Sequence, residues 1–283
     1  MFSLKPHVPM NPRRLWWCPT GPLSFLPLHA AGIYSLNETC APSSCLSDFA
    51  ISSYTPTVSS LLVKVNDSAD IQPVPPSKLL IISQPDTPGR SSIPCTTKEM
   101  DAIWKTIGEN PSDCLRLEAE AATVSRVKVE MASHSSIHFA CHASQDVKAP
   151  LMSGFYLHDG RLELMEIMKL RVTHSELAFL SACQTSTGDE KLSEEAVHLA
   201  AGMLAVGYRG VVATMWSIKD KYGPVVAESF YEYLMNKATP GKPRLDTANA
   251  AHALHHAIQC IREQVGDTER GLLTWVPYVH FGY

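Results

Sequence analysis

The sequence lacks a hydrophobic run long enough to cross a membrane. A transmembrane helix needs roughly 18 consecutive apolar residues, and the longest candidates here, residues 79–82 and 199–206, are short or interrupted by glycine. Near the N-terminus, Pro19, Gly21 and Pro22 break up any apolar core of a signal peptide. We therefore expect a soluble, cytoplasmic protein that has no membrane partner.

Positive charge is also scarce and scattered. The chain carries 24 Lys and Arg residues against 28 Asp and Glu residues, a formal net charge of −4 at pH 7. Nucleic-acid-binding proteins gather basic residues into a patch or stripe. No such stripe occurs in this sequence, which argues against nucleic acid as the primary partner.

The sequence lacks the signatures of a disulfide scaffold and of the common cofactor sites. Its eight cysteines are widely spaced, unlike those of small secreted domains, so reduced thiols are expected. It has no GxGxxG, phosphate-loop or HExxH motif. His138, Cys141 and His142 lie close together, but successive strand residues point to opposite faces and cannot converge on one ion. We expect no cofactor and no metal.

Proline and serine divide the chain into two unequal parts. Residues 1–76 hold many of the 20 prolines, and residues 32–57 are rich in Ser, Thr, Pro and Ala, a composition typical of loops. The tryptophans and leucines of this irregular part are too apolar to remain exposed. We expect it to dock on a core formed by residues 77–283.

From Lys78 onward, short apolar runs alternate with amphipathic stretches, which predicts an α/β fold around a mainly parallel sheet. The expected strands are dominated by apolar residues, as strands covered on both faces are. They span residues 79–83, 136–141, 176–181 and 210–215. Helical periodicity predicts buried helix faces, and a weaker pattern predicts one further helix and a hairpin. The segments are residues 196–204, 226–234 and 250–261 for the faces, 118–131 for the weaker helix and 155–164 for the hairpin.

Two residues that suit nucleophilic catalysis follow expected strands. His142 follows the strand 136–141 and Cys183 follows the strand 176–181. Ligands bind beyond the carboxyl ends of the strands in open α/β sheets, and neighbouring strands lie about 4.8 Å apart. If these two strands are neighbours, the histidine can deprotonate the thiol and make it a nucleophile for acyl transfer.

The same chemistry needs donors for the developing oxyanion. The backbone amides of Ala143 and Cys183 are the candidates, with the loop at Gln184 beside them. A buried structural thiol is the competing interpretation of Cys183, but the polar residues 184–189 that follow it favour an exposed loop.

Three blocks of sequence carry a resemblance to a known family. IHFACHASQD (137–146), LAFLSACQTSTGDEKLSEEAVHLAAGML (177–204) and GYRGVVATMWSIKD (207–220) resemble the core of the CHAT family, which is grouped with caspases, gingipains and separase in one peptidase clan. LWWCPTGPLSFLPLHAAG (15–32) resembles the amino-terminal half of that domain. The resemblance implies a caspase-like three-layer sandwich, with a mainly parallel central sheet flanked by helices.

The resemblance also implies an activity. His142 is similar to the catalytic histidine and Cys183 to the catalytic cysteine of a peptidase that acts on protein or peptide substrates. CHAT domains often follow tetratricopeptide (TPR) or other sensor repeats, which implies regulated proteolysis in signalling or defence. The clan's histidine is commonly followed by Gly, whereas this sequence has Ala143. An alanine restricts positive φ, so a catalytically silent interaction module is the alternative function.

Residues 215–220 resemble the segment that builds the pocket for the substrate's P1 residue in separase-like members. By that resemblance Trp216 is a pocket wall, and Asp220 receives a basic side chain. Capping of a helix that begins near Lys221 is an equally good interpretation of Asp220.

Overall fold

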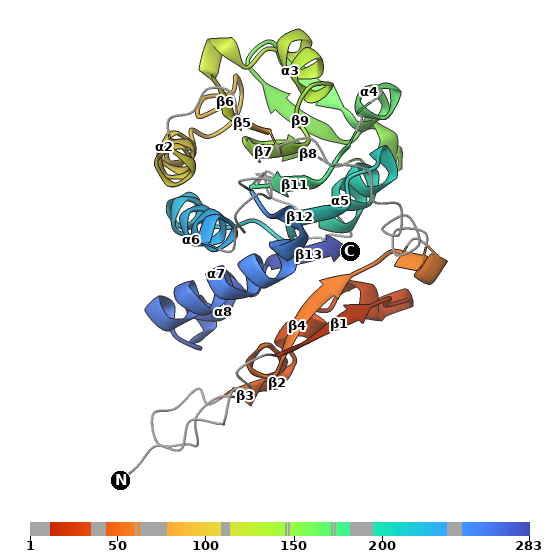
Figure 1. The fold of residues 1–283 in the computed structure, drawn as a ribbon, viewed down its shortest axis with the longest axis vertical. Coiled ribbons are helices and arrows are strands. Elements are labelled where there is room, and N and C mark those ends of the chain that lie inside the picture. The colour runs from red at the N-terminus through yellow and green to blue at the C-terminus, as the bar shows by residue number, and fades with distance from the viewer. Residues whose placement is uncertain are drawn as a thin grey trace.

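One eight-stranded sheet runs through the centre of the molecule, in the order β1-β4-β13-β12-β11-β7-β5-β6 (Figure 1). The computed structural model describes residues 12–34, 44–59, 61–62, 78–108, 114–144, 146, 148–170, 172, 174–181, 195–236 and 245–283, and the backbone alone for residues 195–198. All neighbouring strands of this sheet are parallel except β12 and β13. The strands are β1 (Arg13–Trp17), β4 (Ala50–Tyr54), β13 (Tyr278–Gly282), β12 (Gly210–Thr214), β11 (Leu177–Leu180), β7 (Ser136–Ala140), β5 (Leu79–Ser83) and β6 (Cys114–Glu118).

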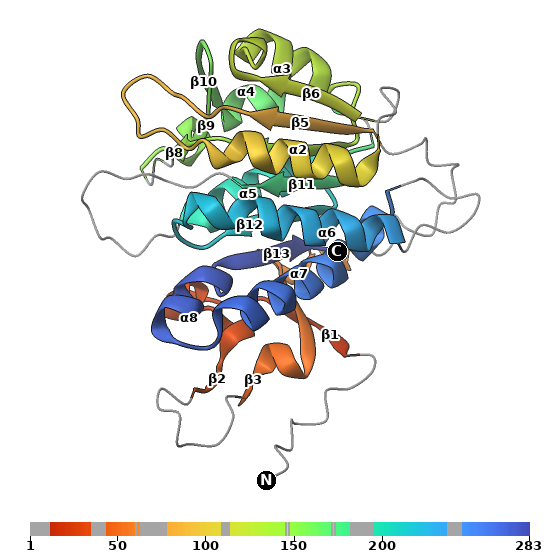
Figure 2. The ribbon, with the colours of Figure 1, turned by 90° about the vertical axis from the view of Figure 1, so that its left-hand side faces the viewer.

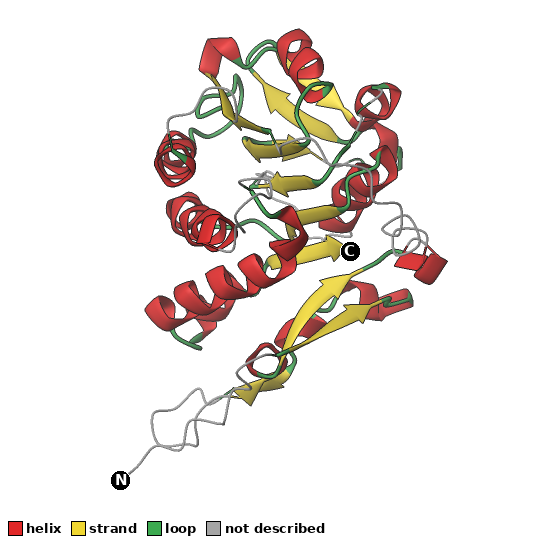
Figure 3. Ribbon diagram, in the orientation of Figure 1, coloured by secondary structure: helices red, strands yellow, loops and turns green. Residues whose placement is uncertain are grey.

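Helices cover both faces of the sheet and make three layers (Figure 3). One face is covered by α2 (Cys95–Ile107), α6 (Gly223–Asn236), α7 (Ala250–Val265) and α8 (Glu269–Trp275), of which α2, α6 and α7 lie side by side in Figure 2. The other face is covered by α3 (Val124–Met131), α4 (Leu164–Lys169) and α5 (Glu195–Val206). Successive strand residues alternate between these layers: Ile81 packs toward α2 and α6, and Ile82 packs toward α3 and α5.

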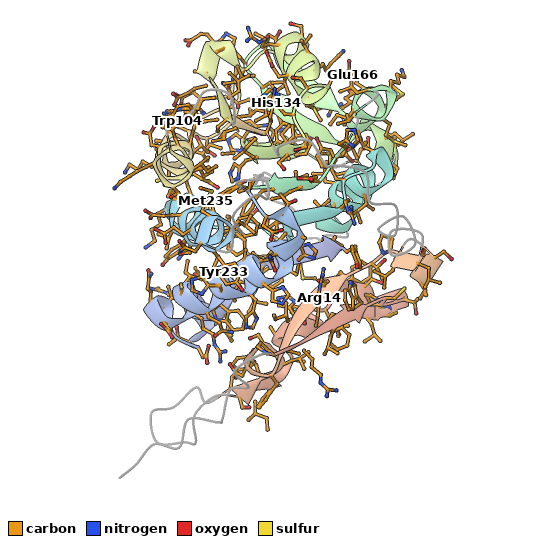
Figure 4. All side chains as sticks on the ribbon, in the orientation of Figure 1. Arg14, Trp104, His134, Glu166, Tyr233 and Met235 are labelled. Carbon is orange, nitrogen blue, oxygen red and sulfur yellow. The ribbon has the colours of Figure 1, made fainter. Side chains whose placement is uncertain are left out.

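The four strands predicted from apolar runs are confirmed to within one residue at each end. Every residue of β5, β7 and β11 is buried, as covering on both faces requires. The predicted faces of α6 and α7 are buried as well, with Phe230 and Ile261 among their most enclosed residues. Tyr233 of α6 reaches toward α7, where its ring centroid lies 5.4 Å from that of His256 (Figure 4).

The helix predicted over residues 118–131 was wrong in its first part. Residues 114–118 form β6, in which Leu117 is buried and pairs with Ile82 of β5. The helix α3 begins only at Val124, because Thr123 caps it by accepting from the Arg126 amide at 3.3 Å.

The predicted hairpin is confirmed and belongs to a small antiparallel ribbon. The ribbon consists of β8 (Ala143–Ser144), β9 (Gly154–Leu157) and β10 (Gly160–Glu163), in the order β10-β9-β8. Its turn is tied to α3, because the Asp159 carboxylate accepts from the Val124 amide at 2.7 Å. The ribbon therefore stands on the α3 side of the sheet, directly after β7.

The described part of residues 1–76 contacts the C-terminal elements. It includes β1, β4 and the short pair β2 (Gly32–Ile33) and β3 (Ser44–Cys45). The His29 ring binds the Tyr54 hydroxyl and the Val276 carbonyl, both at 2.9 Å, and His280 binds the Ser53 hydroxyl at 3.0 Å. The boundary at residue 76 stays a prediction. No helix among the described residues is long and apolar enough to cross a membrane.

Two buried histidines predict that the folded protein loses stability in acid. Burial lowers the pKa of His29 to about 4 and the pKa of His280 well below its ordinary value. Below pH ~6.5 the unfolded chain binds these protons and the folded chain does not, so stability is complete above pH ~6.5 and falls as the pH drops toward 4. We expect a loss of up to about 1.4 kcal/mol per pH unit for each histidine, measured by urea unfolding.

A histidine variant tests this origin. His29→Gln removes one titrating group, so its stability should fall less steeply between pH 6.5 and 4.5 than that of the wild type. His158→Gln, at the exposed ribbon turn, is the matched control and should keep the wild-type slope. Equal slopes for all three proteins would contradict the assignment.

Candidate active site

The two predicted catalytic residues follow neighbouring parallel strands. β7 and β11 pair directly, with Phe139 opposite Leu180, so the expectation that their strands are neighbours is confirmed. His142 lies two residues beyond the end of β7. Cys183 and Gln184 lie outside the described residues. The site is therefore built here from His142 and the described groups around it.

The His142 ring is buried and held by a backbone carbonyl. Its Nε2 lies 2.8 Å from the carbonyl oxygen of Ser91, in the loop between β5 and α2. A carbonyl only accepts hydrogen bonds, so Nε2 carries the proton and donates it. In the neutral ring Nδ1 then holds the lone pair, and it is the nitrogen able to act as a base. Sequence reasoning missed Ser91, because a backbone carbonyl has no residue-type signature.

Ala143 fits its position without strain. It is the first residue of β8, is 1% exposed, and pairs with Phe155 of β9. It is not among the described non-glycine residues with positive φ, which are Ala119 and His174. Alanine does not strain this position, because the backbone is extended and the methyl group packs in the core.

His138 and Cys141 lie in different layers, as predicted from strand alternation. The His138 ring stacks on Phe179 at 4.6 Å and binds Glu99 of α2 and Tyr231 of α6. Cys141 packs in the opposite layer, where burial raises the pKa of its thiol. The two side chains therefore cannot hold one ion together, and His138 is a core histidine with both ring nitrogens bonded.

Trp216 and Asp220 lie in the segment between β12 and α6. Trp216 is partly buried against both hydrophobic layers, and its indole Nε1 has no hydrogen-bond partner within the described residues. Asp220 caps a helix, but not the one that follows it. Its Oδ2 accepts from the amide of Cys95 at 2.9 Å, at the first residue of α2.

Glu99 of α2 lies in turn at the start of α6, and sequence reasoning missed this residue. It is 3% exposed on α2, and its Oε1 lies 3.0 Å from Nε2 of His138. Its Oε2 lies against Gly223, the first residue of α6, where an added Cβ would meet it at 2.5 Å. Glu99 of α2 thus lies at the N-terminal end of α6, and Asp220, just before α6, lies at the N-terminal end of α2; helix N-termini carry positive partial charge and commonly have carboxylates beside them. We call this pair the carboxylate clasp.

The comparisons agree with this architecture. The model of the CHAT domain matches residues 2–283. The chain belongs to the CHAT family. No curated protein matches it.

Solved peptidases share the fold of the CHAT domain at low sequence identity. The Arg-specific cysteine proteinase gingipain R (RGPB) aligns with a TM-score of 0.54 and 11% identity over 82% of this chain and 53% of that chain. The complex of the Porphyromonas gingivalis RgpB pro- and mature domains aligns with a TM-score of 0.54 and 10% identity, over 82% of this chain and 55% of that chain. The Saccharomyces cerevisiae separase–securin complex aligns with a TM-score of 0.54 and 14% identity, over 84% of this chain and 14% of that chain. The chain thus spans about half the length of the gingipain chains, and the likeness shows a caspase-like α/β fold.

The carboxylate clasp predicts that Gly223 does not tolerate a side chain. The backbone of Gly223 is helical, with φ −50° and ψ −53°, so only the clash with Glu99 opposes alanine. We expect Gly223→Ala to lower the free energy of unfolding by about 1–3 kcal/mol.

Thermal and urea unfolding measure this effect. Gly160→Ala is the control, because its Cβ would meet Val124 at an ordinary 3.8 Å. In a Glu99→Ala background, Gly223→Ala should cost clearly less, since the clashing carboxylate is gone. An equal cost in both backgrounds would rule out the clash.

Proposed function

We propose that the chain is a cysteine endopeptidase in which His142 is the base and Cys183 the nucleophile. The observation that carries this proposal is the hydrogen bond between Nε2 of His142 and the Ser91 carbonyl. It leaves Nδ1 as the basic nitrogen, just beyond the end of a strand that directly neighbours the one leading to Cys183. The family and the fold of the similar peptidases support the same assignment.

The proposed reaction needs no cofactor. Nδ1 of His142 takes the thiol proton of Cys183, and the thiolate attacks the carbonyl carbon of the scissile peptide bond. The backbone amides of Ala143 and Cys183 stabilise the oxyanion of the tetrahedral intermediate. His142 then gives its proton to the departing amine, which leaves a thioester. A water molecule that His142 deprotonates attacks the thioester, and the thiol is released together with the new carboxyl end.

In this proposal the segment between β12 and α6 contacts the substrate. Trp216 forms a wall of the pocket for the P1 residue, Gln184 lies beside the scissile bond, and Asp220 receives a basic P1 side chain. One Asp220 oxygen accepts from the Cys95 amide, so the other is the oxygen assigned to the substrate. We further propose regulated proteolysis in the cytoplasm, for signalling or defence, under a TPR-type or other sensor protein or domain.

The catalytic pair is tested by covalent labelling. A peptide acyloxymethyl ketone with Arg at P1 alkylates an activated thiolate, so it should label the wild type and neither Cys183→Ala nor His142→Ala. Cys260→Ser is the control. Burial is the main cause that raises the pKa of the Cys260 thiol, so this thiol stays protonated and should not react with the probe. The variant should label like the wild type, as seen by intact-protein mass spectrometry.

The alternative function gives a different outcome. A catalytically silent CHAT module would keep the fold and leave the wild type unlabelled by probes with Arg, Asp, Leu or Met at P1. Labelling that survives Cys183→Ala would instead show that another cysteine reacts.

Two variants of Asp220 separate its capping role from its proposed pocket role. Asparagine still accepts from the Cys95 amide but lacks the charge, so Asp220→Asn should lose only about 0.3–1 kcal/mol of stability. It should lower kcat/KM at least tenfold for a substrate with Arg at P1, and much less for one with citrulline, its uncharged analogue. Asp220→Ala should in addition lose about 0.5–2 kcal/mol of stability with the cap. If Asp220→Asn cleaves both substrates like the wild type, Asp220 is only a helix cap.

A further inference from the structure

Beside His142, one arginine of the antiparallel ribbon and one arginine of the loop before α2 converge on a tyrosine of the ribbon. Tyr156 of β9 donates its amide to the His142 carbonyl at 2.8 Å. Arg90 directly precedes Ser91, whose carbonyl binds the His142 ring. Arg90, Tyr156 and Arg161 form one cluster, in which Tyr156 bonds to His142, Arg90 adjoins a residue that does, and Arg161 pairs with Tyr156 across the ribbon. We call it the arginine–tyrosine cluster.

The contacts within the cluster place both guanidinium groups at the tyrosine. The Arg90 guanidinium carbon lies 3.9 Å from the centre of the Tyr156 ring, and Arg161 stands opposite Tyr156 in the β9–β10 register. Both arginines hydrogen-bond to the Tyr156 hydroxyl. Arg161 also donates to Ser144 at 3.3 Å and to Glu163 at 2.8 Å.

The electrostatics around Tyr156 favour negative charge. Burial opposes its ionisation, but hydrogen bonds from Ser144, Arg90 and Arg161, together with the Arg90 charge, outweigh burial and lower the pKa of the hydroxyl. Arg90, Tyr156 and Arg161 are each only partly buried, so a ligand is able to reach them. Planar guanidinium groups bind carboxylates through paired hydrogen bonds, which makes a carboxylate a fitting ligand.

We infer that the arginine–tyrosine cluster is a subsite for an acidic side chain of the peptide substrate, close to the scissile bond. This inference rests on the proposed function and adds a substrate class to it. The preferred peptides would carry Glu or Asp at one position, or two adjacent positions, near the cleaved bond. The alternative is that the cluster only braces the ribbon against the loop before α2.

Matched peptide substrates test the subsite. The parent is an internally quenched peptide with Arg at P1 and Gln at the four positions on each side, and each Gln is replaced in turn by Glu. We expect Glu at one or two adjacent positions to raise kcat/KM about tenfold over the parent, and less at high salt, because salt screens exposed charges. Arg90→Gln and Arg161→Gln should each bring the Glu-to-Gln ratio close to one.

The ratio within each variant cancels any general loss of activity. Tyr156→Phe keeps the ring under Arg90 but removes the hydroxyl that holds the two guanidinium groups, so it should reduce the ratio partly. Arg126→Gln is the control: this exposed arginine pairs with Glu130 on α3 and its loss should leave the ratio unchanged.

A binding experiment keeps this inference separate from the proposed function. Fluorescein-labelled forms of the same peptides are titrated with Cys183→Ala, and fluorescence anisotropy reports their Kd. If the wild type cleaves none of the peptides, the peptidase proposal fails, whereas tighter binding of a Glu peptide that Arg161→Gln abolishes still supports the subsite. Equal Kd values for Glu and Gln peptides, or no binding of any of them, would overturn it.

Discussion

The buried carboxylate of Glu99 fixes the helices that frame the candidate site. A carboxylate at 3% exposure is costly unless it is compensated, and here His138 and the start of α6 compensate it. Asp220, in the segment just before α6, caps α2 in turn. This carboxylate clasp joins the two helices at their N-terminal ends, so the segment that carries Trp216 is held between β12 and a fixed helix start. A side chain at Gly223 would force the Glu99 carboxylate to shift, because the carboxylate lies against the backbone there.

A second constraint is the strand order, which brings distant residues to His142. Because β5, β7 and β11 are adjacent and parallel, the loop after β5 and the chain after β11 leave the same edge of the sheet as His142. The loop after β5 supplies the Ser91 carbonyl, 51 residues away in sequence. The ribbon that follows β7 holds the backbone of His142 through Tyr156. Orientation of the ring is thus a product of topology and not of neighbouring sequence.

The difference between features set by local sequence and features set by topology explains which elements could be predicted. The strands β5, β7, β11 and β12 were found because both of their faces are buried, which leaves uninterrupted apolar runs. The helix α2 was missed because its buried stripe includes Thr96 and Glu99 beside Met100 and Ile103, which breaks the apolar period. Glu99 and Arg161 have the sequence signature of ordinary surface charges, and only tertiary packing gives them buried or convergent partners. A backbone acceptor such as Ser91 leaves no signature at all.

The charges around His142 are sorted by layer. The carboxylate clasp lies with α2 and α6, whereas the arginine–tyrosine cluster lies on the ribbon above the opposite layer. The formal net charge of −4 hides this sorting, because opposite charges cancel in the sum while remaining separate in space. An extended peptide advances about 3.3 Å per residue. Different residues of a bound substrate would therefore lie at the two charged regions. If the proposed peptidase function holds, a single bound strand would present its basic and its acidic side chain to these two separate regions.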